Sequence, residues 1–222
     1  MRRFDIVREF LKAIAIVTMT IDHIGAIFYP QYVFLRIIGR LSFPIFSYLL
    51  VLGTESTGNV RNYVSRLLFF GLVSQIPYFL AFGYGPLEQL NIFFALSLGV
   101  ISVVLYKKRS LLILFPMLAT FLNVEGGLYG IMVILSMALL KEDRKIGVIA
   151  FVFINLLFLP ESNVQIFSIL ALPIILLHDG GLLRMDIEIK EDSILYSIRK
   201  YFFYVYYPLH LTVLYLIKSR IF

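Results

Sequence analysis

The sequence predicts an all-α, polytopic membrane protein, and three observations favour that fold class. Hydrophobic residues make up 60% of the 222 residues and charged residues only 15%, whereas about a quarter of a typical soluble domain is charged. The hydrophobic residues form long blocks separated by polar clusters, as in helices that cross a bilayer. Basic residues gather in alternate connections, which is typical of cytoplasmic loops. A single multi-pass domain over 1–222, in the plasma membrane, is expected.

Nine apolar segments follow one another, and each is expected to form a transmembrane helix, with eight and ten as alternative counts. A helix needs about 20 residues to cross a ~30 Å hydrocarbon core. The first four segments and the last reach that length. The four between are shorter, with about 14 residues or about 21 Å of helix each, so they would need flanking residues or a thinner bilayer. The segments are 9–29, 33–53, 62–83, 90–106, 110–123, 127–140, 146–159, 165–178 and 199–218.

The positions of the basic residues predict the orientation of this bundle. Lys and Arg cluster before the first segment and after the second, fourth and sixth, and the alternate loops contain none. By the positive-inside rule the N-terminus is cytoplasmic and the C-terminus lies outside, although Lys218 and Arg220 depart from the rule. The net charge of +6 therefore reflects topology, and no nucleic-acid partner is expected. The hydrophilic stretch 179–200 is expected to be a cytoplasmic loop or an amphipathic surface helix.

Polar residues inside the apolar segments predict a site in the outer half of the membrane. Asp22 and His23 are adjacent in the first segment, and Arg36 and Arg40 have the i, i+4 spacing that places both on one helix face. A charge in hydrocarbon costs several kcal/mol, so it is retained where it has a partner or a role. Counted from the outer helix ends, Asp22 and Arg40 lie about 8–10 Å deep. The same count places Gln75 and His210 about 10 Å deep and Asn155 about 6 Å deep.

Each of these residues also has a purely structural interpretation. Asp22 and Arg40 could form an ion pair that joins two helices. His23 could make an interhelical hydrogen bond, and His210 could accept a backbone donor freed by Pro208. Arg36 is expected to extend towards lipid headgroups. The other residues with a structural interpretation are Gln75 and Asn155 as contacts between helices and His178 as a helix cap or as a side chain that extends to the membrane surface.

A metal site is not expected in this chain. Asp22 and His23 are neighbours on one helix, so their side chains project about 100° apart and cannot chelate as an i, i+4 pair can. The sequence contains no cysteine, which excludes thiolate ligands and disulfides. Enzyme, transporter and assembly factor remain open on the residues alone.

Several segments resemble the TraX family of membrane proteins. The resemblance implies a link to N-terminal acetylation of conjugative pilin. It also implies a relation to transmembrane acyltransferases such as heparan-α-glucosaminide N-acetyltransferase and bacterial sugar O-acetyltransferases. The similarity to that wider group rests on FPIF…G within 43–53 and on the polar pair of the first segment. The segments that carry the family resemblance are KAIAIVTMTIDHIGAIF (12–28), LRIIGRLSFPIFSYLLVLGTESTGNVRNYVSRLL (35–68), SQIPY (74–78), NIFFALSLG (91–99), VEGGLYGI (124–131) and FFYVYYPLHLTVLYLI (202–217).

The resemblance implies an acetyltransferase that uses cytoplasmic acetyl-CoA as its acyl donor and an amine or hydroxyl of an unidentified protein or glycan, such as a pilin N-terminus, as its acceptor. A histidine would move the proton, Arg40 would stabilise the thioester oxyanion, and Asp22 would orient His23 or Arg40 or act as the base. The partners expected are the bilayer, acyl-CoA, the acceptor and a second copy in a homodimer. The residues implied are His23, Asp22, Arg40 and His210 for catalysis, and Arg36, Arg61, Arg66, Lys107 and Lys108 for the acyl-CoA phosphates.

Two other functions are compatible with the same residues. A proton-coupled transporter or flippase would use Asp22, His23 and Arg40 as a relay. A non-catalytic assembly factor for a surface filament would need no chemistry in the site. Binding of acyl-CoA separates the acyltransferase from both alternatives.

Overall fold

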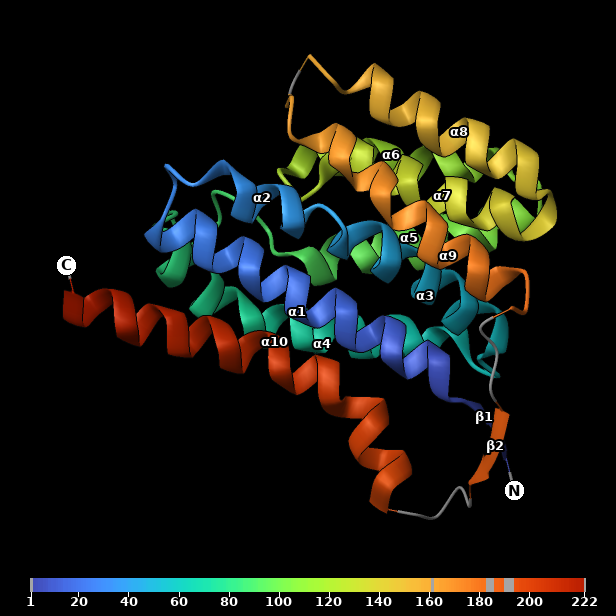
Figure 1. Cartoon of the computed structure of the whole chain (residues 1–222), viewed down its shortest axis with the longest axis horizontal. Coiled ribbons are helices and arrows are strands. Elements are labelled where there is room, and N and C mark those ends of the chain that lie inside the picture. The colour runs from blue at the N-terminus through green and yellow to red at the C-terminus, as the bar shows by residue number, and fades with distance from the viewer. Residues whose placement is uncertain (1, 161, 183–185, 190–193, 222) are drawn as a thin grey trace.

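The chain folds into a bundle of helices (Figure 1). The computed structural model describes residues 2–160, 162–182, 186–189 and 194–221. Short 3-10 turns are η1 (Leu111–Ile113), η2 (Thr120–Leu122) and η3 (Gln165–Ala171). In chain order the α-helices are α1 (Ile6–Phe28), α2 (Val33–Gly39), α3 (Ser42–Ser56), α4 (Val60–Phe82), α5 (Ile92–Lys107), α6 (Leu114–Ala119), α7 (Gly127–Glu142), α8 (Arg144–Leu157), α9 (Leu172–Asp179) and α10 (Ile194–Ile221).

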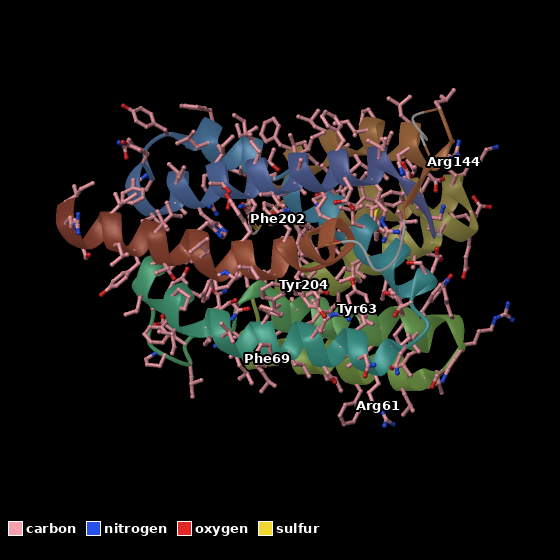
Figure 2. All side chains as sticks on the ribbon, turned by 90° about the horizontal axis from the view of Figure 1, so that it is seen from below. Arg61, Tyr63, Phe69, Arg144, Phe202 and Tyr204 are labelled. Atoms are coloured by element: carbon pink, nitrogen blue, oxygen red, sulfur yellow. The ribbon has the colours of Figure 1, made fainter. Side chains whose placement is uncertain are left out.

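Helices α3, α5 and α7 pack against one another at the centre of the bundle. Helix α1 contacts α3, α4 contacts α5, and α8 packs on α7, while α10 lies along α4 and also touches α1 (Figures 1 and 2). Ile45, Phe93 and Ile134 come from the three central helices and are completely buried. A Cβ at Gly147 would overlap the backbone of Leu140, so a glycine is required where α8 approaches α7.

In the part of the chain that the structure describes, three helical stretches are long and apolar enough to cross a membrane. They are Ile6–Phe28, Val33–Ser56 and Val60–Phe82, and the second combines α2 and α3. Five long spans were expected. Of the other two, α5 has 16 residues, and α10 has 28 residues but is rich in tyrosine, which lowers its hydropathy. Outward-facing side chains such as those of Phe10 and Leu72 are exposed and apolar, as lipid contact requires.

Some predicted helices are interrupted, and proline accounts for part of this. The segment 33–53 was expected to be one helix, but α2 ends at Gly39, a turn follows at Arg40 and Leu41, and α3 begins at Ser42. Pro44 has no N–H with which to continue the helical hydrogen bonds back to Arg40. The segment 110–123 likewise forms only η1, α6 and η2, with Pro116 inside α6. The segment 165–178 begins as η3 before α9.

The hydrophilic stretch 179–200, expected to be a loop or a surface helix, contains strand β2 and the first residues of α10 where the structure describes it. Strand β2 (Asp186–Ile189) pairs antiparallel with β1 (Arg2–Asp5), so the N-terminus is tied to the connection before α10. The two termini lie at opposite ends of the bundle (Figure 1).

Lys218 departs from the positive-inside pattern, and the structure gives this residue a local role. Its ammonium group donates to the carbonyl oxygen of Ala81, with 3.1 Å between the nitrogen and the oxygen. Ala81 lies in the last turn of α4, where unpaired carbonyl groups favour a cation. The charge therefore stabilises the end of α4.

Candidate functional site

A cavity of about 140 Å³ lies among α1, the end of α2 and the turn after it, α3, α5, the start of α7 and the connection before it, η3 and α10. One water molecule occupies about 30 Å³ in the liquid, so the cavity has room for a small reacting group. Apolar side chains such as Phe43 and Leu96 form part of its wall. The polar side chains that line it include Asp22, His23, Arg40, Glu125, Tyr129 and Gln165.

Asp22 holds two arginines. Its Oδ2 accepts a hydrogen bond from Arg36 at 2.6 Å and its Oδ1 accepts one from Arg40 at 2.8 Å. Arg36 also donates to the backbone carbonyl of Asp22 at 3.0 Å. The close approach of α2 to α1 depends on Gly39, because a Cβ there would overlap the Asp22 carboxylate. Hydrogen bonds between charged groups are the stronger kind, so Asp22 orients the guanidinium group of Arg40.

Two sequence interpretations are corrected by this arrangement. Arg36 does not extend towards headgroups, because its guanidinium group binds Asp22. Asp22 does not hold His23, whose Nδ1 instead lies 2.8 Å from Nε2 of His210, so the interhelical hydrogen bond considered for His23 is present. Of the orienting roles considered for Asp22, the structure supports that for Arg40.

A chain of polar side chains supports Arg40 from its other side. Arg40 donates to Gln165 Oε1 at 3.0 Å, and Gln165 Nε2 donates to the Tyr129 hydroxyl at 2.7 Å. The hydroxyl group of Tyr129 in turn donates to Asn155 at 3.1 Å. Asn155 thus belongs to the layer behind the cavity. Gln75, expected at the same depth, lies elsewhere, since it binds Asn91 and the backbone of Gln89.

The hydrogen bonds of the two histidines determine which ring nitrogens carry protons. His210 Nδ1 lies 3.1 Å from the carbonyl oxygen of Tyr206, and a carbonyl can only accept, so this nitrogen carries the proton. In neutral His210 the other nitrogen, Nε2, must then accept from His23 Nδ1. His23 is therefore left with an unprotonated Nε2, which has no hydrogen-bond partner in the described part of the chain. Since His23 lines the cavity, its Nε2 can act as a base there.

Glu125 is a cavity residue that the sequence analysis missed. It lies in the connection between η2 and α7, and it accepts hydrogen bonds from the Tyr207 hydroxyl, at 3.5 Å, and from the backbone of Ile92. Burial of the carboxyl group raises the pKa of Glu125 to about 7, and the charge of Asp22 adds to the rise. The signal was present in the sequence, because VEGGLYG places a carboxylate beside two glycines between apolar segments.

The five basic residues implied for acyl-CoA do not form one site. Arg36 lies at Asp22, close to the end of α1, whereas Arg61 lies at the start of α4, at the opposite end of the bundle (Figure 1). The remaining residues in the group are Arg66 in α4, Lys107 at the end of α5 and Lys108 just after it. A donor site built from these residues excludes Arg36.

The environments of these four residues differ. Arg61 is exposed and points away from the bundle (Figure 2). The guanidinium group of Arg66 lies 5.7 Å from the ring centre of Tyr63 and 5.8 Å from that of Tyr204, and both rings lie where α4 meets α10 (Figure 2). Lys107 forms an ion pair with Glu55 at 2.6 Å. Lys108 is exposed.

His178 lies away from the cavity and does not serve as a simple helix cap. Its Nε2 lies 2.7 Å from the Asp5 carboxylate and its Nδ1 lies 2.9 Å from the Tyr48 hydroxyl. These contacts join the end of α9 to the start of α1 and to α3. Among the residues that the structure describes, no three His, Asp or Glu side chains are grouped as a metal ion would require.

Comparison with known proteins relates the chain to one family. The family model described as TraX protein matches residues 7–218. A protein of Dichelobacter nodosus named "Probable fimbrial assembly protein FimC, serogroup H1" is 26% identical over an alignment of 234 positions that covers 96% of each chain. Protein TraX of Escherichia coli is 32% identical over 93 residues, 41% of this chain and 37% of that protein. No solved structure matches the chain.

Proposed function

The chain belongs to the TraX family, and from that premise we propose that it is a multi-pass membrane acetyltransferase. It takes an acetyl group from acetyl-CoA on the cytoplasmic side and transfers it to an amine or hydroxyl of a protein or glycan at the outer side. The observation that carries the proposal is the cavity itself. His23, whose Nε2 is left unprotonated, and Arg40 both line this one small space.

His23 and Arg40 have the chemistry that acyl transfer needs. The acceptor nitrogen or oxygen attacks the thioester carbonyl carbon while His23 Nε2 takes its proton. Arg40 donates to the carbonyl oxygen as negative charge develops on it, an effect that low dielectric strengthens. The carbon–sulfur bond then breaks, and the thiolate leaves as the free thiol once it is protonated.

The other two predicted residues position these groups. His210 lies outside the cavity lining and holds the ring of His23 through the 2.8 Å hydrogen bond. Asp22 and Gln165 hold Arg40 from two sides. Such a supporting layer keeps catalytic groups in productive geometry before the substrate arrives.

A second candidate function is non-catalytic assembly of a surface filament. The D. nodosus relative, whose printed name is that of a fimbrial assembly protein, aligns with 96% of this chain. In that case the cavity residues would only join helices, and acetyl-CoA would not bind. Proton-dependent uptake in vesicles would instead favour the transporter that the sequence left open.

Nine transmembrane helices with a cytoplasmic N-terminus should give a defined labelling pattern. Cysteines introduced at Glu88 and Asn163 should react with a membrane-impermeant maleimide in intact cells. Cysteines at Ser110 and Glu142 should react only after permeabilisation, because positive-inside loops face the cytoplasm. The chain has no native cysteine, so the wild-type protein should not react with the maleimide and serves as the negative control. The opposite pattern would overturn both the topology and the assignment of the cavity to the outer half.

Acetyl-CoA should stabilise the detergent-solubilised protein against heat, because a ligand that binds only the folded state adds about 2.7 kcal/mol at 100 times its Kd. Arg61→Glu should reduce the shift in Tm, since it replaces an exposed cytoplasmic cation by an anion. Lys145→Glu is the matched control, because it makes the same charge change on α8 and should leave the shift intact. If saturating acetyl-CoA and longer acyl-CoAs leave the Tm unchanged, the proposal that the protein is an acyltransferase is contradicted.

A further inference from the structure

We infer that Glu125 is the general acid of this cavity, a group that protonates the leaving thiolate while His23 takes the proton of the acceptor. The inference rests on the proposed acetyl transfer and assigns it a second catalytic residue. Three observations support it. Glu125 lines the cavity, a fixed turn positions its carboxyl group, and no ion pair among the described residues includes that group.

Glu125 and His23 reach the same cavity from different walls. His23 comes from α1, and Glu125 comes from the connection before α7. Tyr207 of α10 links the two walls, because its hydroxyl group donates to Glu125 at 3.5 Å and its ring packs edge-on against His23 with centres 6.2 Å apart. A reacting carbonyl group placed in the cavity therefore has a base on one side and a carboxyl group on another.

The backbone around Glu125 is held firmly. Its N–H donates to the Leu90 carbonyl at 2.8 Å, and Leu90 N–H donates to Asn123 at 2.9 Å. Gly126 and Gly127 follow with φ of 81° and 48°, a left-handed conformation that glycine adopts without strain. The carboxyl group is thus positioned by a fixed turn.

Glu125 differs from the other cavity carboxylate in its partners. Both oxygens of Asp22 are bound by guanidinium groups, and no ion pair of the described residues includes Glu125. A nearby cation favours the charged carboxylate, so a carboxyl group without a cation partner keeps its proton to higher pH. The pKa of Glu125, raised by burial to about 7, keeps a large protonated fraction at neutral pH. The charged and titratable groups around it are Asp22, His23, Arg36, Arg40, Tyr78, Tyr84 and Tyr207.

His23 and Glu125 together account for both proton transfers of the reaction. The acceptor forms its bond to the carbonyl carbon and gives its proton to His23 Nε2. The carbon–sulfur bond breaks, and the sulfur takes the proton of Glu125. His23 then returns its proton to the Glu125 carboxylate across the cavity, which restores the starting state. Two groups whose environments set opposite protonation states are the arrangement expected of an acid and base pair.

The test is the pH profile of acetyl transfer by the full-length protein and by Glu125→Gln. The wild-type rate should fall as pH rises through about 7, where Glu125 loses its proton. In Glu125→Gln the rate below that pH should drop roughly 10²–10⁴-fold, and the fall around pH 7 should disappear. Glu88→Gln is the matched control, because Glu88 is an exposed carboxylate in the neighbouring connection and should leave both features unchanged.

Melting temperatures provide a second readout that is independent of activity. A carboxyl group with a raised pKa in the folded state stabilises the protein at low pH, and this contribution is lost as pH rises from about 4.5 to about 7. Wild-type Tm should therefore fall relative to that of Glu125→Gln over this range. A wild-type protein that transfers no acetyl group overturns the proposed function. An active wild type with an equally active Glu125→Gln and the same pH profile overturns only the role of Glu125.

Discussion

Replacing His23 with alanine is expected to lower acetyl transfer per folded molecule by roughly 10²–10⁴-fold, the usual contribution of a general base. Binding of acetyl-CoA should persist, because the donor phosphates are expected at the opposite end of the bundle from Asp22. The measurement is the transfer rate normalised to monodisperse protein by gel filtration, together with the Tm shift on adding acetyl-CoA.

His178→Ala is the control for loss of a buried histidine. His178 is as buried as His23 and makes two side-chain hydrogen bonds, but it does not line the cavity. Its replacement should lower stability and leave the rate of the folded fraction near normal. A normal rate in folded His23→Ala would remove His23 as the base.

His210 offers a way to separate positioning from catalysis. His210→Ala removes the acceptor that orients His23 and should lower kcat with little change in the KM for acetyl-CoA. His210→Gln restores a side-chain acceptor and should recover part of the rate, whereas a residue that exchanges protons itself would not be rescued by an amide. Equal losses in the two variants would contradict the positioning role.

The long helices were predictable because residues next to their ends mark where each helix begins and stops. The segments 9–29 and 62–83 correspond to α1 and α4 within a few residues. Asp5 caps the start of α1 through hydrogen bonds to Val7 and Arg8, and Gly83, with φ of 79°, ends α4. Side-chain oxygens at an N-cap and glycine after a C-terminus are the signals that sequence shows directly. The pairing of β1 with β2 joins distant residues and leaves no such signal.

The sequence predicted how deep the cavity residues lie in the membrane, but it did not predict which way each side chain faces. Counting residues along each helix placed Asp22, Arg40 and His210 at one level, and the structure groups all three around His23. The same count placed Gln75 there, yet Gln75 binds a different part of the bundle, because depth says nothing about which way a helix faces. Glu125 was missed because it lies in a connection between two predicted helices, where the count of depth along a helix does not apply, whereas this connection lines the cavity.

Asp22→Asn is expected to cause the largest loss of stability among these variants, about 3 kcal/mol in the free energy of unfolding. Removing one partner of a buried ion pair costs about 3–5 kcal/mol because it leaves an uncompensated charge. Here two guanidinium groups lose their counter-ion, and the lower end of that range is expected because the side chains of Arg36 and Arg40 are 32% and 23% exposed. The measurement is reversible unfolding in mixed micelles.

Glu55→Gln is the matched control, because it also removes one carboxylate charge from an ion pair, that of Glu55 with Lys107. Those side chains are 29% and 40% exposed, and exposed pairs contribute at most about 1 kcal/mol. Asp22→Asn should also slow acetyl transfer in the folded fraction, since Arg40 loses the carboxylate that orients it towards the oxyanion. A stability loss no greater than that of Glu55→Gln would show that solvent, rather than Asp22, satisfies the two arginines, and the cavity would then lack the fixed cation that the mechanism requires.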